Sequence, residues 1–412
     1  MKLPKNRLMV AAALTVAAGF ALSGCASGGS GASTSASGGP IVIGSTLPLT
    51  GSLQAFGTSL QTGYRKAVDE VNAAGGLDVG GSKRQVTLDI QDNASDADKA
   101  SSQARNLVLS DGAVALLGPA TPQLTIPVSI AADQAQVPLI STITPLEAWK
   151  GGSSDGWKYA WDVFFDEDQM TDTQYQTADL VSTNKKVALF TDQEEDGVVM
   201  GGLWSSKASE FGYDIAYQAQ FPVGNANFSS QVAEAKASGA EVVIAQVIPP
   251  DGIALLKEMK AQSYVPKLVF LEKAGNTGGY PKLSDGLAEG TLAANWFAKG
   301  MGLPDEDSFI SEYASQLGGV NSDLGTVVYG YSIAKMLLDA ISSAGSTDPD
   351  AINDAIAKIS GDYPLGSVAF GDDHTSATVA VQTQWVGEDQ VLVLDTQGKA
   401  ANPIVTPTAG LQ

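Results

Sequence analysis

The stretch that decides the fold lies near the start of the chain, where residues 41–76 are IVIGSTLPLTGSLQAFGTSLQTGYRKAVDEVNAAGG. Residues 41–47 form a short apolar run bounded by Pro and Gly, which is typical of a buried strand. Residues 58–74 then carry apolar side chains at helical spacing, and Gly75-Gly76 supplies a left-handed helix cap. This segment therefore predicts a strand followed by a helix.

The same alternation continues in two series. The first predicts strands at 84–91, 113–117 and 137–140, with helices at 96–110 and 123–135. The second predicts strands at 186–190, 214–219, 241–245 and 267–271, with helices at 198–211, 228–238 and 251–261. An irregular stretch at 145–165 separates the two series. Strand–helix alternation predicts parallel sheets covered by helices on both faces, so we expect two Rossmann-like lobes.

The last third of the chain continues with helices and ends in strands. We expect helices at 305–317, 324–344 and 349–359, followed by strand-like runs at 365–370, 378–386 and 390–395. No segment after the N-terminal leader is expected to span a membrane. In open parallel sheets ligands bind at the carboxyl ends of the strands, so a site is expected in the cleft between the lobes.

The N-terminus resembles an export signal with a lipid attachment site. Basic residues precede an apolar run from Leu8 to Leu22, which is shorter than the roughly 20 residues of a membrane span. The run ends in Leu22-Ser23-Gly24-Cys25, which resembles the lipobox of bacterial lipoproteins. Residues 1–24 are therefore interpreted as a lipoprotein signal peptide, and residues 25–40 as a lipidated Cys25 with a flexible Gly/Ser tether. The alternative is an ordinary signal peptide with an incidental cysteine.

The composition excludes several classes of function. The chain has 412 residues, with 24 Lys and Arg against 45 Asp and Glu, a net charge of −21 that would repel nucleic acid. Its single Cys and single His cannot supply a usual structural zinc site. The acidic run at 192–197 begins like a calcium loop, but Leu203 stands where a Glu is needed. We therefore expect neither a metal nor a cofactor.

Catalysis finds little support. Gly330-Tyr331-Ser332-Ile333-Ala334 mimics a nucleophile elbow, but Ser332 lies inside a predicted helix instead of at the end of a strand. His374, the only candidate imidazole base, lies in what reads as an exposed turn. We therefore expect a protein that is not an enzyme.

A series of short motifs carries a family resemblance from residue 41 to residue 395. They are Pro48-Leu49-Thr50-Gly51, Asp69-Glu70-Val71-Asn72 with Gly75-Gly76, Asp92-Asn93, Gly118-Pro119, Val137-Pro138-Leu139-Ile140-Ser141, Tyr329-Gly330-Tyr331 and Phe370-Gly371-Asp372. In this order they resemble the substrate-binding proteins of branched-chain amino acid (Leu/Ile/Val-type) ABC transporters, which have the type I periplasmic-binding-protein fold.

The resemblance implies an α/β fold of two Rossmann-like lobes with parallel sheets, joined by three hinge crossings. By analogy the crossings fall near 161–165, 291–295 and 377–381. Lobe 1 would comprise residues 41–162 plus 294–377, and lobe 2 residues 163–293 plus 378–412. Closure on a ligand would be a hinge motion.

The resemblance also implies the residues of the ligand site. In this family two loops of lobe 1 hold the carboxylate and ammonium of an amino acid, which here correspond to Thr121, Pro122 and Gln123 and to Thr142, Ile143 and Thr144. Phe56 stands where an aromatic lid is common. In lobe 2, family tyrosines align with Asp196 and near Ile248, and Glu272 aligns with a carboxylate that pairs with the ligand ammonium.

Simpler interpretations compete for the same residues. Thr121 and Thr144 fit helix N-caps, Phe56 fits the core, and Asp196 and Glu272 fit solvated acids at the ends of elements.

Two departures from the family pattern bear on the ligand. Pro122 stands where Ser is usual and has neither a hydroxyl nor an N–H group. Asp196 in place of Tyr makes the pocket more polar than one for leucine. A small polar or zwitterionic amino acid, an amide such as urea, or another small organic solute fits such a pocket.

The expected protein is a monomeric solute receptor outside the cytoplasm, anchored by lipid to the outer face of the bacterial cytoplasmic membrane, at the cell surface or in the periplasm. It would deliver its ligand to the permease subunits of an ABC transporter. A receptor that feeds a signalling partner is the alternative, and a hydrolase is a third possibility.

Overall fold

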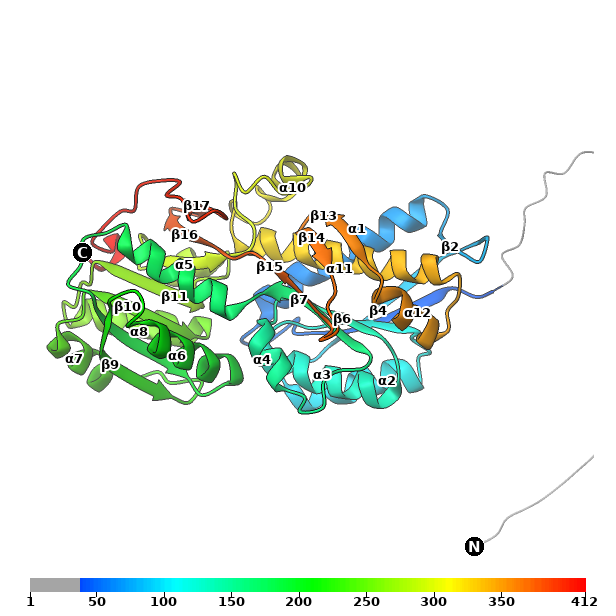
Figure 1. Ribbon diagram of the computed structural model, residues 1–412, viewed down its shortest axis with the longest axis horizontal. Helices are drawn as coiled ribbons and strands as arrows, with labels where there is room; N and C mark the ends of the chain where they lie inside the picture. Colours follow the sequence, from blue (N-terminus) through cyan, green and yellow to red (C-terminus); the bar gives the residue numbers. More distant parts are fainter. Residues whose placement is uncertain (1–37) are drawn as a thin grey trace, which may run out of the picture. The chain divides into compact units, whose positions relative to one another are not determined.

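The computed structural model describes residues 38–412. The predicted signal peptide, Cys25 and the tether up to residue 37 lie outside the described residues. The described residues belong to one compact unit, which is organised around two large sheets (Figure 1). We call the part built on the six-stranded sheet lobe 1 and the part built on the seven-stranded sheet lobe 2.

All neighbouring strands of the lobe 1 sheet run parallel. Their order is β15 (Thr375–Thr378), β7 (Ala160–Phe165), β6 (Leu139–Ser141), β5 (Ala115–Leu117), β1 (Ile41–Leu47) and β4 (Val86–Asp92). β1 pairs with strands on both sides and is buried along almost its whole length, which explains the nearly continuous apolar run at 41–47.

Helices and two short hairpins complete lobe 1. The helices are α1 (Gln54–Ala73), α2 (Ala97–Leu109), α3 (Pro122–Ala135), α4 (Leu146–Gly151), α11 (Ser322–Ala344) and α12 (Pro349–Ile356). The hairpins pair β2 (Leu77–Val79) with β3 (Ser82–Arg84) and β13 (Ser360–Tyr363) with β14 (Gly366–Ala369). The predicted strand at 365–370 is therefore one arm of a hairpin.

The lobe 2 sheet is parallel except at one edge. Its order is β17 (Asp389–Leu394), β16 (Val381–Val386), β12 (Leu292–Asn295), β11 (Leu268–Lys273), β10 (Val242–Val247), β8 (Lys186–Asp192) and β9 (Asp214–Phe221). β16 is antiparallel to β12 and β17 is antiparallel to β16, so the expected parallel sheet carries two antiparallel pairings at this edge. The reason is that β16 and β17 form a hairpin, whereas parallel neighbours need a crossover.

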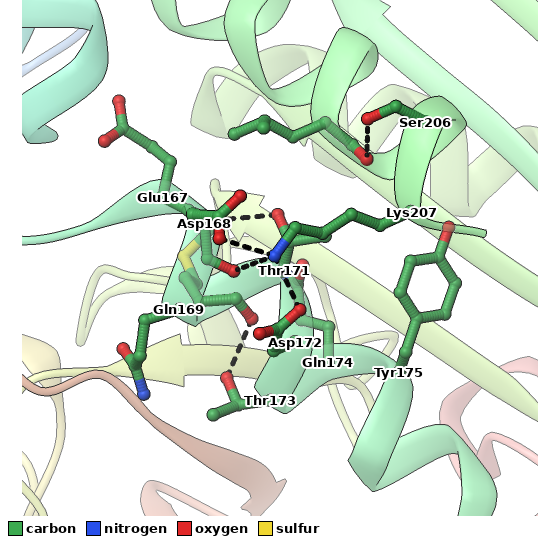
Figure 2. Close-up of polar contacts among 12 residues, drawn as sticks. Glu167, Asp168, Gln169, Thr171, Asp172, Thr173, Gln174, Tyr175, Ser206 and Lys207 are labelled. Carbon is green, nitrogen blue, oxygen red and sulfur yellow. Dashed lines mark hydrogen bonds and ion pairs between the residues drawn. The ribbon is translucent and has the colours of Figure 1, made fainter. Parts of the chain in front are cut away.

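Five helices accompany the strands of lobe 2: α5 (Glu167–Asp179), α6 (Glu195–Lys207), α7 (Ser229–Ser238), α8 (Pro249–Ala261) and α9 (Tyr280–Leu283). The remaining elements are α10 (Glu306–Tyr313) and a final helical turn at Ala409–Leu411. Lys207 reaches from α6 to Asp168 and Asp172 on α5, at 2.7 Å in both ion pairs, and so ties the two helices together (Figure 2).

The stretch at 145–165 is more regular than its composition suggests, and the expectation of an irregular segment is wrong. It contains α4 and the fully buried strand β7. The Gly- and Ser-rich loop between them obscured the pattern. Two nearby tryptophans pack on each other, because Trp149 stacks on Trp157 with ring centroids 5.1 Å apart.

The chain passes between the two sheets three times within the described residues. It leaves the lobe 1 sheet after β7, returns between β12 and β15, and leaves again between β15 and β16. The last crossing is only Val379-Ala380, which divides the strand predicted at 378–386 into two. The predicted arrangement of two α/β lobes joined by three crossings is confirmed.

The longest helix, α11, lies against α1 (Figure 1). A Cβ atom on Gly63 would lie 2.3 Å from the Val327 carbonyl oxygen, so the absence of a side chain allows the two backbones to approach. By length and composition α11 could cross a membrane, which corrects the expectation that no later segment could. However, 83% of its most apolar window is buried inside the protein, so α11 is a core helix here.

Candidate ligand-binding site

A cavity of about 40 Å³ lies where strand ends of the two sheets meet. A single bound water needs roughly 10–15 Å³ of such cavity volume, so there is room for a few water-sized molecules. From lobe 1 it is lined by Phe56, Thr121, Pro122, Ile143, Pro145, Phe164 and Phe165. From the lobe 2 side it is lined by Met170, Asp196, Met200, Gln246, Glu272, Lys273, Asn276 and Trp296.

Most of these residues follow or end a strand. Thr121 follows β5, Ile143 follows β6 and Trp296 follows β12, whereas Gln246 and Lys273 lie at the ends of β10 and β11. This is the position at which open α/β sheets bind ligands. Aromatic rings form much of the wall, and Phe164 meets Trp296 edge to face with ring centroids 5.0 Å apart.

Two strained residues of lobe 1 face each other across the ends of β5 and β6. Thr121 and Ile143 have φ values of 68° and 55°, a left-handed conformation that β-branched residues rarely adopt. The Thr121 N–H donates to the Ile143 carbonyl at 2.9 Å, which joins the two loops. The Thr121 hydroxyl is buried and has no hydrogen-bond partner among the described residues. A ligand atom would satisfy it.

Four predicted site residues do not line the cavity. Thr142 donates to the Val163 carbonyl at 2.7 Å, and Thr144 pairs with Thr125 at 2.9 Å, so both hydroxyls serve the interior of lobe 1. Gln123 lies one residue into α3 from Pro122. Ile248 is the N-cap residue of α8, and Gln246, two residues earlier, faces the cavity instead.

Glu272 is held by donors from two elements. Its side chain accepts from Gln174 Nε2 at 2.6 Å and from the Ala294 N–H at 3.0 Å. Trp204 Nε1 donates to Gln174 Oε1, which orients the Gln174 amide so that its NH₂ group faces Glu272. Burial raises the pKa of Glu272 to about 7, against the lowering effect of the hydrogen bonds from Ala294 and Gln174.

Asp196 and Glu272 are both only 3% exposed, so their interpretation as solvated acids is wrong. Asp196 lies in the first turn of α6, and its carboxylate accepts from Gln246 Nε2 at 2.9 Å. Gly197 makes this turn possible, because a Cβ there would lie 2.3 Å from Asp192 Oδ1. Both acids therefore belong to the wall of the cavity.

Lys273 is a charged residue of the cavity wall that the sequence analysis did not identify. It is 6% exposed, has φ 64°, and lies 3.2 Å from Asp196 Oδ2 and 3.8 Å from Asp192 Oδ2. Burial acts to lower the pKa of Lys273, but Asp196 and Asp192 outweigh it and raise the pKa above its ordinary value. The sequence feature that could have identified Lys273 is the charged pair Glu272-Lys273 at the end of an otherwise apolar strand.

The residues considered for catalysis are engaged elsewhere. Ser332 lies inside α11 and donates to the Val328 carbonyl at 2.8 Å. His374 is half-buried, not exposed as expected, because its ring stacks on Trp161 with centroids 3.6 Å apart. Within residues 38–412, no group of three or more His, Cys, Asp or Glu side chains is arranged to hold a metal ion.

The fold and the interlobe cavity together define a two-lobed binding protein. The family model described as periplasmic binding protein matches residues 40–390, so the chain belongs to that family. This confirms the resemblance inferred from the sequence, including the type I periplasmic-binding-protein fold. The family and the relatives that match are binding proteins.

Individual relatives give the same picture. An amino acid binding protein of Pseudomonas aeruginosa is 26% identical, and the match covers 75% of this chain and 80% of the relative. LivJ, a branched-chain amino acid transporter substrate binding protein of Streptococcus pneumoniae, was solved with isoleucine. It is 22% identical with a TM-score of 0.72, covering 85% of this chain and 97% of that one.

A third protein shows that the fold takes other ligands. An ABC transporter solute binding protein of R. palustris was solved with benzoate. It is 16% identical with a TM-score of 0.71, covering 86% of this chain and 96% of that one. The shared fold therefore does not identify the ligand of this chain.

Proposed function

We propose that this chain is the solute-capturing lipoprotein of an ABC transporter and not an enzyme. It would be anchored outside the cytoplasm through lipidated Cys25 and would capture a small amino acid or amide-like solute between its lobes. The loaded, closed form would then dock on the permease subunits. We propose lobe boundaries near residues 162, 293 and 377, which would make β7, β12 and β15 the bending strands.

One observation carries this proposal: Glu272 points a fixed, buried carboxylate at a cavity lined from both lobes. Among residues 38–412 its Oε2 atom accepts only the Ala294 N–H, at 3.1 Å, and retains capacity for another donor. A ligand ammonium there would be paired with charge, which offsets the desolvation cost of both groups. The unpartnered Thr121 hydroxyl would serve the opposite end of the ligand.

Isothermal titration of the full-length protein with amino acids and small amides tests the proposal. We expect binding by at least one of them, and at least a tenfold weaker affinity for an amino ligand in a Glu272→Gln variant. Glu234→Gln, an exposed acid on α7, is the matched control and should bind like the wild type. If a folded wild-type protein binds no small polar solute, the proposal is wrong.

The membrane anchor needs a separate experiment. Wild-type protein expressed in a bacterium should incorporate labelled fatty acid and sediment with membranes, whereas Cys25→Ser should do neither. Wild-type protein that incorporates no labelled fatty acid would contradict the lipid anchor. The proposal for the solute site would be unaffected.

A further inference from the structure

We propose that Lys273, Asp196 and Gln246 form a polar subsite that recognises a neutral amide group on the ligand, and that Lys273 is the residue that determines this specificity. This inference rests on the proposed function, because it names the chemical class of solute for the same cavity. The three residues come from three elements, β11, α6 and β10, and all line the cavity.

Stability does not explain this arrangement. Lys273 has a left-handed backbone conformation, which is energetically unfavourable for a residue other than glycine. Its ion pair with Asp196 is buried, and buried pairs add little net stability because both ions lose their hydration. A costly charged group on the wall of a cavity is therefore better explained by what it contacts in the ligand.

The hydrogen bonds of the subsite are incomplete on both sides. The Lys273 ammonium has three N–H donors. Its contacts are both carboxylate oxygens of Asp196, at 3.2 and 3.3 Å, a long 3.4 Å contact to Gln123, and Asp192 at 3.8 Å, which is beyond hydrogen-bond range. At least one donor is thus poorly used.

An acceptor lies on the other side of the same carboxylate. Gln246 Nε2 donates to Asp196, so the Gln246 Oε1 atom faces away from that acid. The opposite orientation of the Gln246 amide would place its oxygen against a carboxylate oxygen of Asp196. Gln246 Oε1 and Asp192 Oδ2 are both buried and have no hydrogen-bond partner among the described residues. A weakly used donor and a free acceptor therefore flank Asp196.

A carboxamide matches this pair. Its carbonyl oxygen would accept from Lys273, and its NH₂ group would donate to Gln246 Oε1. An apolar group would leave the buried polar groups unpaired, and sites built for hydrogen bonding reject such analogues by as much as about 10⁴-fold. A carboxylate would meet Asp192 and Asp196, two acids against one lysine, and would be repelled.

Near-isosteric amino acids provide the test. Leucine, asparagine and aspartate share one shape but end in an apolar, an amide and an acidic group, and methionine, glutamine and glutamate repeat the series one atom longer. By titration calorimetry at pH 7.5 we expect the amide of one series to bind at least tenfold tighter than its apolar and acidic counterparts.

Lys273→Met removes the ammonium donor and keeps an unbranched side chain only one atom shorter, and it should weaken amide binding at least tenfold without weakening leucine or methionine. The double variant Lys273→Met with Asp196→Asn avoids an unpaired buried acid, and it should lose the same preference if the single variant does not fold. Lys257→Met, an exposed lysine on α8, is the matched control and should keep the wild-type preference.

The outcomes separate the two proposals. If wild-type protein binds leucine or methionine tightest and Lys273→Met leaves the order unchanged, the inference is overturned while the proposed function stands. Tightest binding of aspartate or glutamate would also overturn it. If a folded wild-type protein binds none of the six, the proposed function fails and the inference fails with it.

Discussion

At the scale of single residues, three strained backbone positions lie where the ligand is expected. Thr121, Ile143 and Lys273 all line the cavity and all have positive φ, a conformation that usually needs glycine. Such conformations persist only when the surroundings hold them, as the hydrogen bond from Thr121 to Ile143 does. Only the structure reveals them, because nothing in the sequence around a threonine or an isoleucine marks a left-handed backbone.

The buried acids predict how the unliganded protein responds to pH. The pKa of Glu272 is raised from 4.5 to about 7, chiefly by burial, and burial also raises the pKa of Asp192. Between pH 4.5 and 7 the folded state then binds more protons than the unfolded state, so stability falls as pH rises through this window.

Glu272→Gln should remove part of this pH dependence. We expect the wild-type free energy of unfolding, measured by urea titration, to lose on the order of 3 kcal/mol from Glu272 between pH 4.5 and pH 8, and the variant to lose correspondingly less. Glu234→Gln should follow the wild type. An identical slope in Glu272→Gln and wild type would show that Glu272 titrates normally in the folded protein.

At the scale of elements, glycines decide which helices can pack closely. Gly63 lies at the contact of α1 with α11, and there a Cβ would clash with backbone atoms of Val327 and Tyr331. Gly202 lies in the middle of α6, where a Cβ atom would have open space and no neighbour within 4 Å. The two glycines look alike in the sequence, and only packing distinguishes them.

A matched pair of substitutions tests this difference. Gly63→Ala should destabilise the protein by several kcal/mol because backbone atoms must move apart. Gly202→Ala should stabilise it by up to about 1 kcal/mol, since alanine favours a helix interior. Both are measured by urea unfolding of the unliganded protein. Equal effects would mean that the α1–α11 contact is looser than described.

At the scale of the whole molecule, the two lobes meet directly at the cavity. Lys273 of lobe 2 contacts Gln123 of lobe 1, and α6 lies near α3 and α4. We propose that the three crossings act as hinges at which the lobes move as units. A ligand that fills the cavity would therefore contact both lobes at once and favour the closed arrangement.

Trp296 offers a signal for this event, because it lines the cavity and packs against Phe164. The tightest-binding solute of the titration should change the tryptophan fluorescence of the wild type, and Trp296→Phe should lose most of that change. Trp157→Phe, which removes a ring stacked on Trp149, should retain it. Loss of the signal only in Trp157→Phe would place the ligand elsewhere.

Apolar periodicity and the spacing of short motifs are local properties of a chain. They were therefore enough to predict the alternation of strands and helices, its division into two series, and the family. The family resemblance also predicted Phe56, Thr121, Pro122, Ile143, Asp196 and Glu272 as site residues, and all six line the cavity. Only the tertiary structure decided that Lys273 and Gln246 face the cavity while Thr144 and Ile248 do not. Successive side chains of a strand ordinarily point to opposite sides, yet Glu272 and Lys273 both line the cavity, because Lys273 departs from strand geometry with φ 64°.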